Sequence, residues 1–234
     1  MSRRGFGGLV TDAQWSRLVS EGVRIPFAEG ETLLGQGGTD GGVHLVLSGR
    51  TRVVSVQQDG TSVPLAFRTR GEVLGEGSLT GGERSATVTA LGATTTAFLP
   101  SERFRRLLDD LGLETAMWRS ILMRQHESDQ IRIQRSLLPS ERRLPAALVH
   151  LAEVLGDPIP PAITDGPEAA GEGSLLRVSL TQQEIADFVG MSRTSVHLAY
   201  IRLKESGLIR TGRQYVAIRD LETLKALARG DGDV

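Results

Sequence analysis

Four polar side chains lie close together near residue 195, and their types are suited to recognising the bases of nucleic acid. They are Arg193, Thr194, Ser195 and His197. A guanidinium can form a paired hydrogen bond with the major-groove edge of guanine, and hydroxyl and imidazole groups donate or accept single hydrogen bonds. Such recognition requires that the side chains project from the amino end of one helix. His197 is interpreted equally well as an ordinary solvated histidine.

The residues around this group predict a helix-turn-helix. Thr181 and Glu184 have the spacing of a capping box, which begins a helix. Gly190 ends that helix, since glycine adopts the left-handed conformation that a tight inter-helix turn requires. Ser192 is the expected cap of the second helix, and the small Ala186 lies where the two helices come closest. Helical hairpins of other kinds also produce this spacing by chance.

The residues that follow add a predicted wing. Gly207–Arg210 leads into a strand, residues 211–214 form a turn, and Tyr215–Ile218 forms a second strand. A helix-turn-helix followed by a hairpin is a winged helix. Its side chains expected to contact phosphates are Gln182, Arg210 and Arg213.

Charge alone does not establish nucleic-acid binding. The formal net charge of the chain is −1, so any basic footprint must be local. Between Ser192 and Arg213 there are five basic side chains and one acidic side chain. An excess of this size is also typical of an ordinary solvated helix face.

The amino-terminal half predicts a small antiparallel β-roll. Short β-favouring runs alternate with glycine-containing turns from Val23 to Leu99, and Asp59–Gly60 predicts a tight hairpin. After Pro100 the pattern becomes helical, with a long helix expected over residues 113–138. We therefore expect an α+β fold with a β-roll at residues 1–112, the long helix at 113–138 and the winged helix at 139–234.

The long helix carries a repeat with the spacing of a coiled-coil seam. The repeat is apolar only at its two ends, so it predicts either a surface helix or a dimer helix whose middle touches a ligand. The seam residues are Met117, Ile121, Arg124, Ser128, Ile131, Arg135 and Leu138.

Composition and missing motifs exclude several classes of protein. The chain has no cysteine, which excludes disulfides, thiolate zinc sites and cysteine-held iron–sulfur clusters. No apolar run approaches the roughly 20 residues needed to span a bilayer. The first eight residues lack the apolar core of a signal peptide, so we expect a cytoplasmic location. No Walker, Gly-x-Ser-x-Gly or His-Glu-x-x-His pattern occurs, and we expect no enzymatic activity and no metal site. Haem ligation would have to use histidines without ligand-like context, namely His44, His126 and His150.

With these features, the chain resembles the CRP/FNR superfamily of bacterial transcription regulators from about Val23 to Ile218. The most specific similarity is Gly75-Glu76 followed by Arg84-Ser85-Ala86, which resembles the phosphate-binding cassette of the family. The resemblance implies a cyclic nucleotide as the ligand, with cyclic AMP favoured over cyclic GMP and cyclic di-GMP. In this role the backbone of Gly75 and Gly77 approaches the phosphate, Glu76 accepts from the ribose, and Arg84 and Ser85 donate to the phosphate.

The resemblance also assigns the long helix as a dimer helix and Ser128 as the residue that contacts the base. Asp129 occupies the position that reaches the partner's ligand, where the family's cyclic-AMP receptor has a hydroxyl residue. The resemblance further implies a homodimer on an inverted-repeat site in double-stranded DNA and contact with RNA polymerase. The alternative is the same fold sensing another small molecule or binding DNA without a ligand.

Overall fold

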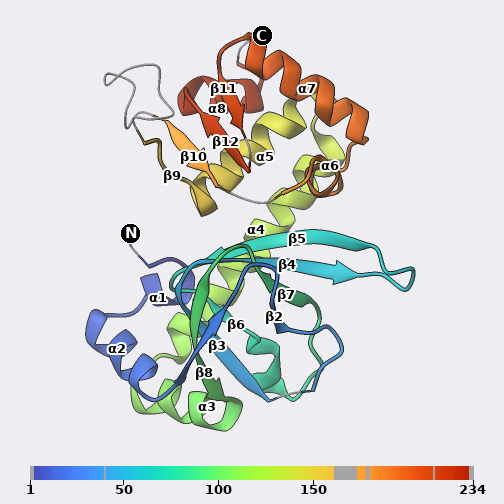
Figure 1. Cartoon of the computed structure of the whole chain (residues 1–234). Helices are drawn as coiled ribbons and strands as arrows, with labels where there is room; N and C mark the ends of the chain where they lie inside the picture. Colours follow the sequence, from blue (N-terminus) through green and yellow to red (C-terminus); the bar gives the residue numbers. More distant parts are fainter. Residues whose placement is uncertain (1–2, 40, 161–172, 178–179, 213, 232–234) are drawn as a thin grey trace. The chain divides into compact units, whose positions relative to one another are not determined.

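The computed structural model describes residues 3–39, 41–160, 173–177, 180–212 and 214–231, and it divides into two compact units (Figure 1). Unit 1 comprises residues 1–129 and unit 2 comprises residues 130–234. The predicted Arg213 lies outside the described residues. None of the helices in the described ranges is long and apolar enough to cross a membrane.

Unit 1 is a β-roll of two four-stranded antiparallel sheets, as the sequence predicted. The first sheet has the strand order β1 (Val23–Phe27), β8 (Thr94–Pro100), β3 (Gly42–Ser48) and β6 (Val73–Leu74). The second sheet has the order β2 (Thr32–Leu34), β7 (Thr87–Ala90), β4 (Arg50–Val56) and β5 (Ser62–Thr69). Buried aliphatic side chains from both sheets pack against one another, including Val46 and Leu74 from the first and Leu34 and Val88 from the second.

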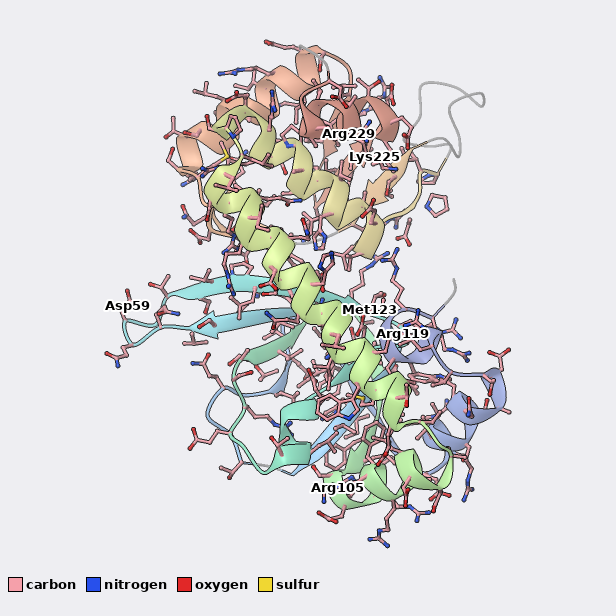
Figure 2. The ribbon with its side chains drawn as sticks, turned by 180° about the vertical axis from the view of Figure 1, so that it is seen from behind. Asp59, Arg105, Arg119, Met123, Lys225 and Arg229 are labelled. Atoms are coloured by element: carbon pink, nitrogen blue, oxygen red, sulfur yellow. The ribbon has the colours of Figure 1, made fainter. Side chains whose placement is uncertain are left out.

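The predicted hairpin at Asp59–Gly60 joins β4 to β5 and is confirmed. Gly60 has a φ of +83°, and the carboxylate of Asp59 accepts a hydrogen bond of 2.9 Å from the backbone N–H of Thr61. The hairpin projects from the roll, and Asp59 is labelled at its tip in Figure 2.

Helices cover the first sheet of unit 1. They are α1 (Gly5–Gly8), α2 (Asp12–Ser20), α3 (Ser101–Asp110) and the beginning of α4 (Glu114–Leu137). Their core includes Phe6 and Phe104, whose rings meet edge to face with centroids 6.2 Å apart. A short 3₁₀ helix, η1 (Glu76–Thr80), lies between β6 and β7.

Unit 2 contains the predicted winged helix. Its helices after the last turns of α4 are α5 (Ser140–Leu155), α6 (Gln182–Val189), α7 (Arg193–Glu205) and α8 (Leu221–Arg229). Its antiparallel sheet has the order β11 (Ile209–Gly212), β12 (Tyr215–Ile218), β10 (Ser174–Leu176) and β9 (Asp157–Pro158). The predicted wing strands are β11 and β12, whereas β9, β10 and α8 were not predicted.

Candidate ligand cavity and nucleic-acid interface

The turn after β6 builds a cradle from backbone groups and one buried arginine. Gly75 has a φ of +83°, which places it in the left-handed region that favours glycine. Arg84 is only 5% exposed, and its Nη1 and Nη2 donate hydrogen bonds of 2.6 Å to the carbonyl oxygens of Gly75 and Gly42, respectively. A Cβ at position 75 would lie 2.3 Å from Nη1 of Arg84. The guanidinium therefore sits directly against the glycine backbone.

This cradle forms one side of a cavity of about 380 Å³ within unit 1. The structure brings seven of the eight sequence-predicted ligand residues to its lining: Gly75, Glu76, Gly77, Arg84, Ser85, Ala86 and Ser128. The eighth, Asp129, is not among the lining residues. Its carboxylate accepts a hydrogen bond of 3.2 Å from the side chain of Gln125, which does line the cavity. The other lining residues are Leu34, Val53, Arg68, Leu74, Glu83, Val88, Ile121, Arg124 and Gln125.

Arg124 of α4 also lines the cavity, and it contacts the cradle. Its Nη1 lies 2.7 Å from the carboxylate of Glu76 and its Nη2 lies 2.6 Å from that of Glu72. Burial lowers the pKa of Arg124, but attraction to Glu76 and Glu72 outweighs burial, so the pKa stands above its ordinary value. Arg124 is therefore a permanent cation, and it holds the carboxylate that the resemblance assigns to the ribose.

A second buried arginine in the cavity was not predicted. Arg68 of β5 is 9% exposed, and its Nη1 lies 2.8 Å from the carboxylate of Glu127 on α4. The same nitrogen donates a hydrogen bond of 2.8 Å to the carbonyl oxygen of Phe67. The sequence signal for Arg68 is a single charged residue after the run Leu65-Ala66-Phe67, which is too common to predict a site. Arg124, by contrast, was one of the predicted seam residues.

The predicted seam of α4 faces the chain's own core at its amino end. Met117 is buried and Ile121 packs against the core of unit 1. A different set of apolar side chains is exposed on the part of α4 that belongs to unit 1, and we call it the outer stripe: Trp118, Leu122 and Met123. Trp118 is 65% exposed and Leu122 is 66% exposed. Figure 2 shows α4 with Arg119 and Met123 labelled.

Unit 2 contains the predicted cap structure of the helix-turn-helix. Thr181 accepts a hydrogen bond from the backbone N–H of Glu184, and the carboxylate of Glu184 accepts one of 2.8 Å from the backbone N–H of Thr181. Gly190 ends α6 with a φ of +66°. Ser192 caps α7 by accepting a hydrogen bond of 3.1 Å from the backbone N–H of Ser195. The capping box, the left-handed glycine and the serine cap predicted from the sequence are therefore all present in the structure.

Three of the four predicted base-reading side chains are exposed at the start of α7: Arg193, Thr194 and His197. Ser195 differs, because its hydroxyl lies 2.8 Å from that of Ser192 and takes part in the cap. Leu198, 48% exposed, was not predicted as a site residue. Among the expected phosphate contacts, Arg210 is exposed on β11 and Gln182 is half-buried in the first turn of α6.

Two arginines of unit 2 hold the turn between α6 and α7. Nε of Arg135, from the last turns of α4, donates a hydrogen bond of 2.6 Å to the carbonyl oxygen of Phe188. Nη1 of Arg143, from α5, donates one of 2.9 Å to the carbonyl oxygen of Gly190. These bonds satisfy carbonyls at the end of α6 that lack partners within the helix. They tie the end of α6 to α4 and α5.

Comparison with known families matches both units. Residues 24–110 match the cyclic nucleotide-binding domain, and residues 142–227 match the Crp-like helix-turn-helix domain. The chain is similar to the transcriptional activator protein FnrA of Stutzerimonas stutzeri, with 27% identity over 89% of this chain and 81% of that protein. It is also similar to the cyclic AMP receptor protein of Thermus thermophilus, with 28% identity over 87% of each chain.

The fold has solved relatives. A CRP/FNR-family transcriptional regulator from Thermus thermophilus superimposes with a TM-score of 0.69 and 24% identity, covering 90% of this chain and all of that one. At this identity the comparison shows the shared fold.

Proposed function

Because this chain belongs to the CRP/FNR family of DNA-binding transcription regulators, we propose that it is a cyclic-nucleotide-controlled regulator that acts as a homodimer. We assign residues 1–112 to ligand binding, 113–138 to dimerisation and 139–234 to DNA binding. Contact with RNA polymerase and action in the cytoplasm, where the DNA is, complete the proposal.

One observation carries the ligand assignment: the cassette residues and Ser128 surround a single cavity. Its size, about 380 Å³, lies near the lower end of the range of small-molecule sites, which suits a compact ligand. Arg84 and the left-handed Gly75 supply a guanidinium and an accessible backbone, the groups that bind a phosphate. Glu76, held by Arg124 through Oε1, supplies the acceptor for a ribose hydroxyl.

The outer stripe of α4 supports the homodimer. An amphipathic helix with large apolar side chains on its exposed side is stabilised when a second copy covers them. A two-fold axis beside α4 would bring the same side chains of both copies together. The interface we propose is therefore centred on Trp118 and Leu122, rather than on the predicted seam residues Ile121 and Ile131.

A dimer of this kind presents two copies of α7 to DNA. Arg193, Thr194 and His197 are the proposed base-reading residues, while Ser192 and Ser195 act mainly as the cap that holds them. Arg210, Gln182 and Arg213 are the proposed phosphate contacts. Two recognition helices related by a two-fold axis require an inverted repeat with half-sites about one helical turn apart.

The test is isothermal titration of the full chain with cyclic AMP, cyclic GMP and cyclic di-GMP, followed by gel-shift titrations on an inverted-repeat site obtained by in vitro selection. Saturable binding of a cyclic nucleotide that changes DNA affinity supports the proposal. Absence of binding at millimolar concentration for all three would contradict it. A ligand tightens DNA binding only if its affinity differs between the two states of the protein.

A further inference from the structure

The buried guanidinium of Arg68 has no role in the cradle described above. Arg68 belongs to β5, whereas the cradle is built from the turn after β6 and from Arg84. Its side chain is 10% exposed and lines the cavity beside aliphatic residues of the roll such as Val53 and Leu34. Burying a charge is costly, and an ion pair repays that cost only when further hydrogen bonds satisfy its remaining donors. A ligand with hydrogen-bond acceptors would accept hydrogen bonds from the guanidinium of Arg68.

Arg68 and the cradle contact different residues of α4. Arg124 holds Glu76 of the cradle, while Glu127 holds Arg68. These two positions are three residues apart, about 4.5 Å along a helix axis. Ser128, which also lines the cavity, follows Glu127 directly. Arg68 and Ser128 line the same cavity as Arg84, so we expect a nucleotide held at its phosphate by Arg84 to place its base toward them.

The hydrogen-bonding geometry of Arg68 favours one purine. Both of its protein contacts use Nη1, and its planar fork also carries the N–H groups of Nε and Nη2. Two parallel donors match two adjacent acceptors, and the O6 and N7 atoms of guanine are such a pair. Adenine instead offers N7 beside the amino group at N6, which is a donor and opposes a second N–H.

We propose that the ligand is cyclic GMP and that Arg68 selects its guanine base by pairing with O6 and N7. The inference rests on the proposed function, because it requires a cyclic nucleotide in this cavity. It changes the order that the resemblance implied, in which cyclic AMP came first. The single cradle of Gly75, Arg84 and Ser85 holds one phosphate, which favours the mononucleotide over cyclic di-GMP.

The first test uses the unaltered full chain and three mononucleotides in isothermal titration. Cyclic GMP is expected to bind roughly 5- to 150-fold more tightly than cyclic AMP, the range for one paired arginine contact with guanine. Cyclic IMP keeps O6 and N7 but lacks the 2-amino group, so its affinity should be closer to that of cyclic GMP. Cyclic IMP that binds as weakly as cyclic AMP would overturn the role of Arg68.

The second test removes the guanidinium of Arg68. The double variant Arg68→Leu with Glu127→Gln avoids leaving a carboxylate without its partner, and its folding is checked by thermal unfolding. The ratio of the cyclic AMP to the cyclic GMP dissociation constant should fall to within about threefold of one. The matched control is Arg70→Leu, an exposed arginine just beyond the end of β5, which should keep the ratio of the unaltered chain. An unchanged ratio in the double variant contradicts the inference.

The outcomes separate this inference from the proposed function. If no cyclic nucleotide binds, the proposed function is wrong. If cyclic AMP binds as tightly as cyclic GMP or more tightly, the proposed function stands and the guanine assignment is wrong. Cyclic di-GMP binding more tightly than cyclic GMP would keep the guanine base but overturn the mononucleotide.

Discussion

Replacing Gly75 by alanine should weaken ligand binding in the cavity, because the substitution displaces the side chain of Arg84. The new Cβ would lie 2.3 Å from Nη1 of Arg84 and 3.1 Å from the carbonyl oxygen of Gly42. The far end of Arg84 must move, which breaks its two 2.6 Å hydrogen bonds to the carbonyls of Gly75 and Gly42. A displaced guanidinium would no longer face the phosphate of the proposed nucleotide. Loss of one charged hydrogen-bonding partner costs about 1.5–3 kcal/mol, which weakens nucleotide binding roughly 10- to 150-fold.

The backbone strain of the same substitution can be measured separately. An L-residue in the left-handed region costs about 1–2 kcal/mol. Gly60, at the tip of the β4–β5 hairpin, has the same φ of +83°, and nothing lies within 4 Å of a Cβ built on it. Gly60→Ala should therefore carry the strain without disturbing Arg84.

The assay is isothermal titration with cyclic GMP and cyclic AMP, with urea unfolding of each variant alongside. We expect Gly60→Ala to lose stability and keep its nucleotide affinity, whereas Gly75→Ala loses both. A Gly75→Ala protein that binds nucleotide like the unaltered chain would refute the role of Arg84. Equal loss of affinity in the two variants would mean that general strain, rather than the cradle, controls binding.

Three further predictions concern the dimer, the DNA contacts and a helix cap. Leu122→Asp would bury a charge in the proposed interface at a cost of about 3 kcal/mol or more, raising the dimer dissociation constant at least roughly 100-fold in analytical ultracentrifugation, while Leu198→Asp on α7 should leave the dimer intact. In gel shifts at several salt concentrations, Arg193→Ala should lose about 1–3 kcal/mol on the specific site only, whereas Arg210→Ala should weaken all sequences alike and reduce the salt slope by about one; equal losses for Arg193→Ala on specific and scrambled duplexes would make it a phosphate contact. Asp220 caps α8 through a 2.8 Å hydrogen bond from the backbone N–H of Thr223, and its bonds to Thr223 lower its pKa. Because the folded pKa lies below the unfolded value, its contribution is present above about pH 4 and is lost as pH falls through the folded pKa. Asp220→Ala should therefore cost about 1 kcal/mol in urea unfolding at pH 7 and progressively less as the pH falls below about 4, and a pH-independent difference would contradict the assignment.

Local chemistry was predictable from the sequence wherever neighbours in the chain determine the structure. The capping box of Thr181 and Glu184, the left-handed Gly190 and the Asp59–Gly60 hairpin each depend on residues within a few positions of one another. Their side chains and backbone groups meet whatever surrounds them. For this reason the helix-turn-helix and its two wing strands followed from the residues alone, whereas β9, β10 and α8 did not.

Contacts between distant segments were not predictable in the same way. The repeat on α4 identifies residues that share a face, but it does not say whether that face meets the chain's own core or another molecule. Ile121 faces the core, and the exposed Leu122 beside it belongs to the outer stripe. Arg68 and Glu127 form their ion pair only because the roll brings β5 against α4. Neither residue is distinctive in the sequence by itself.

The exposed indole on α4 has a practical consequence. The chain has two tryptophans, and Trp15 is buried in the core of unit 1 at 6% exposure, whereas Trp118 is 65% exposed. The emission of a buried indole is insensitive to events outside the core, and that of an exposed indole shifts to shorter wavelength when water is removed from it. If a second copy covers the outer stripe, the protein carries its own optical reporter of assembly at Trp118. The fluorescence maximum, followed on dilution without any added label, would then give the association constant of the two copies.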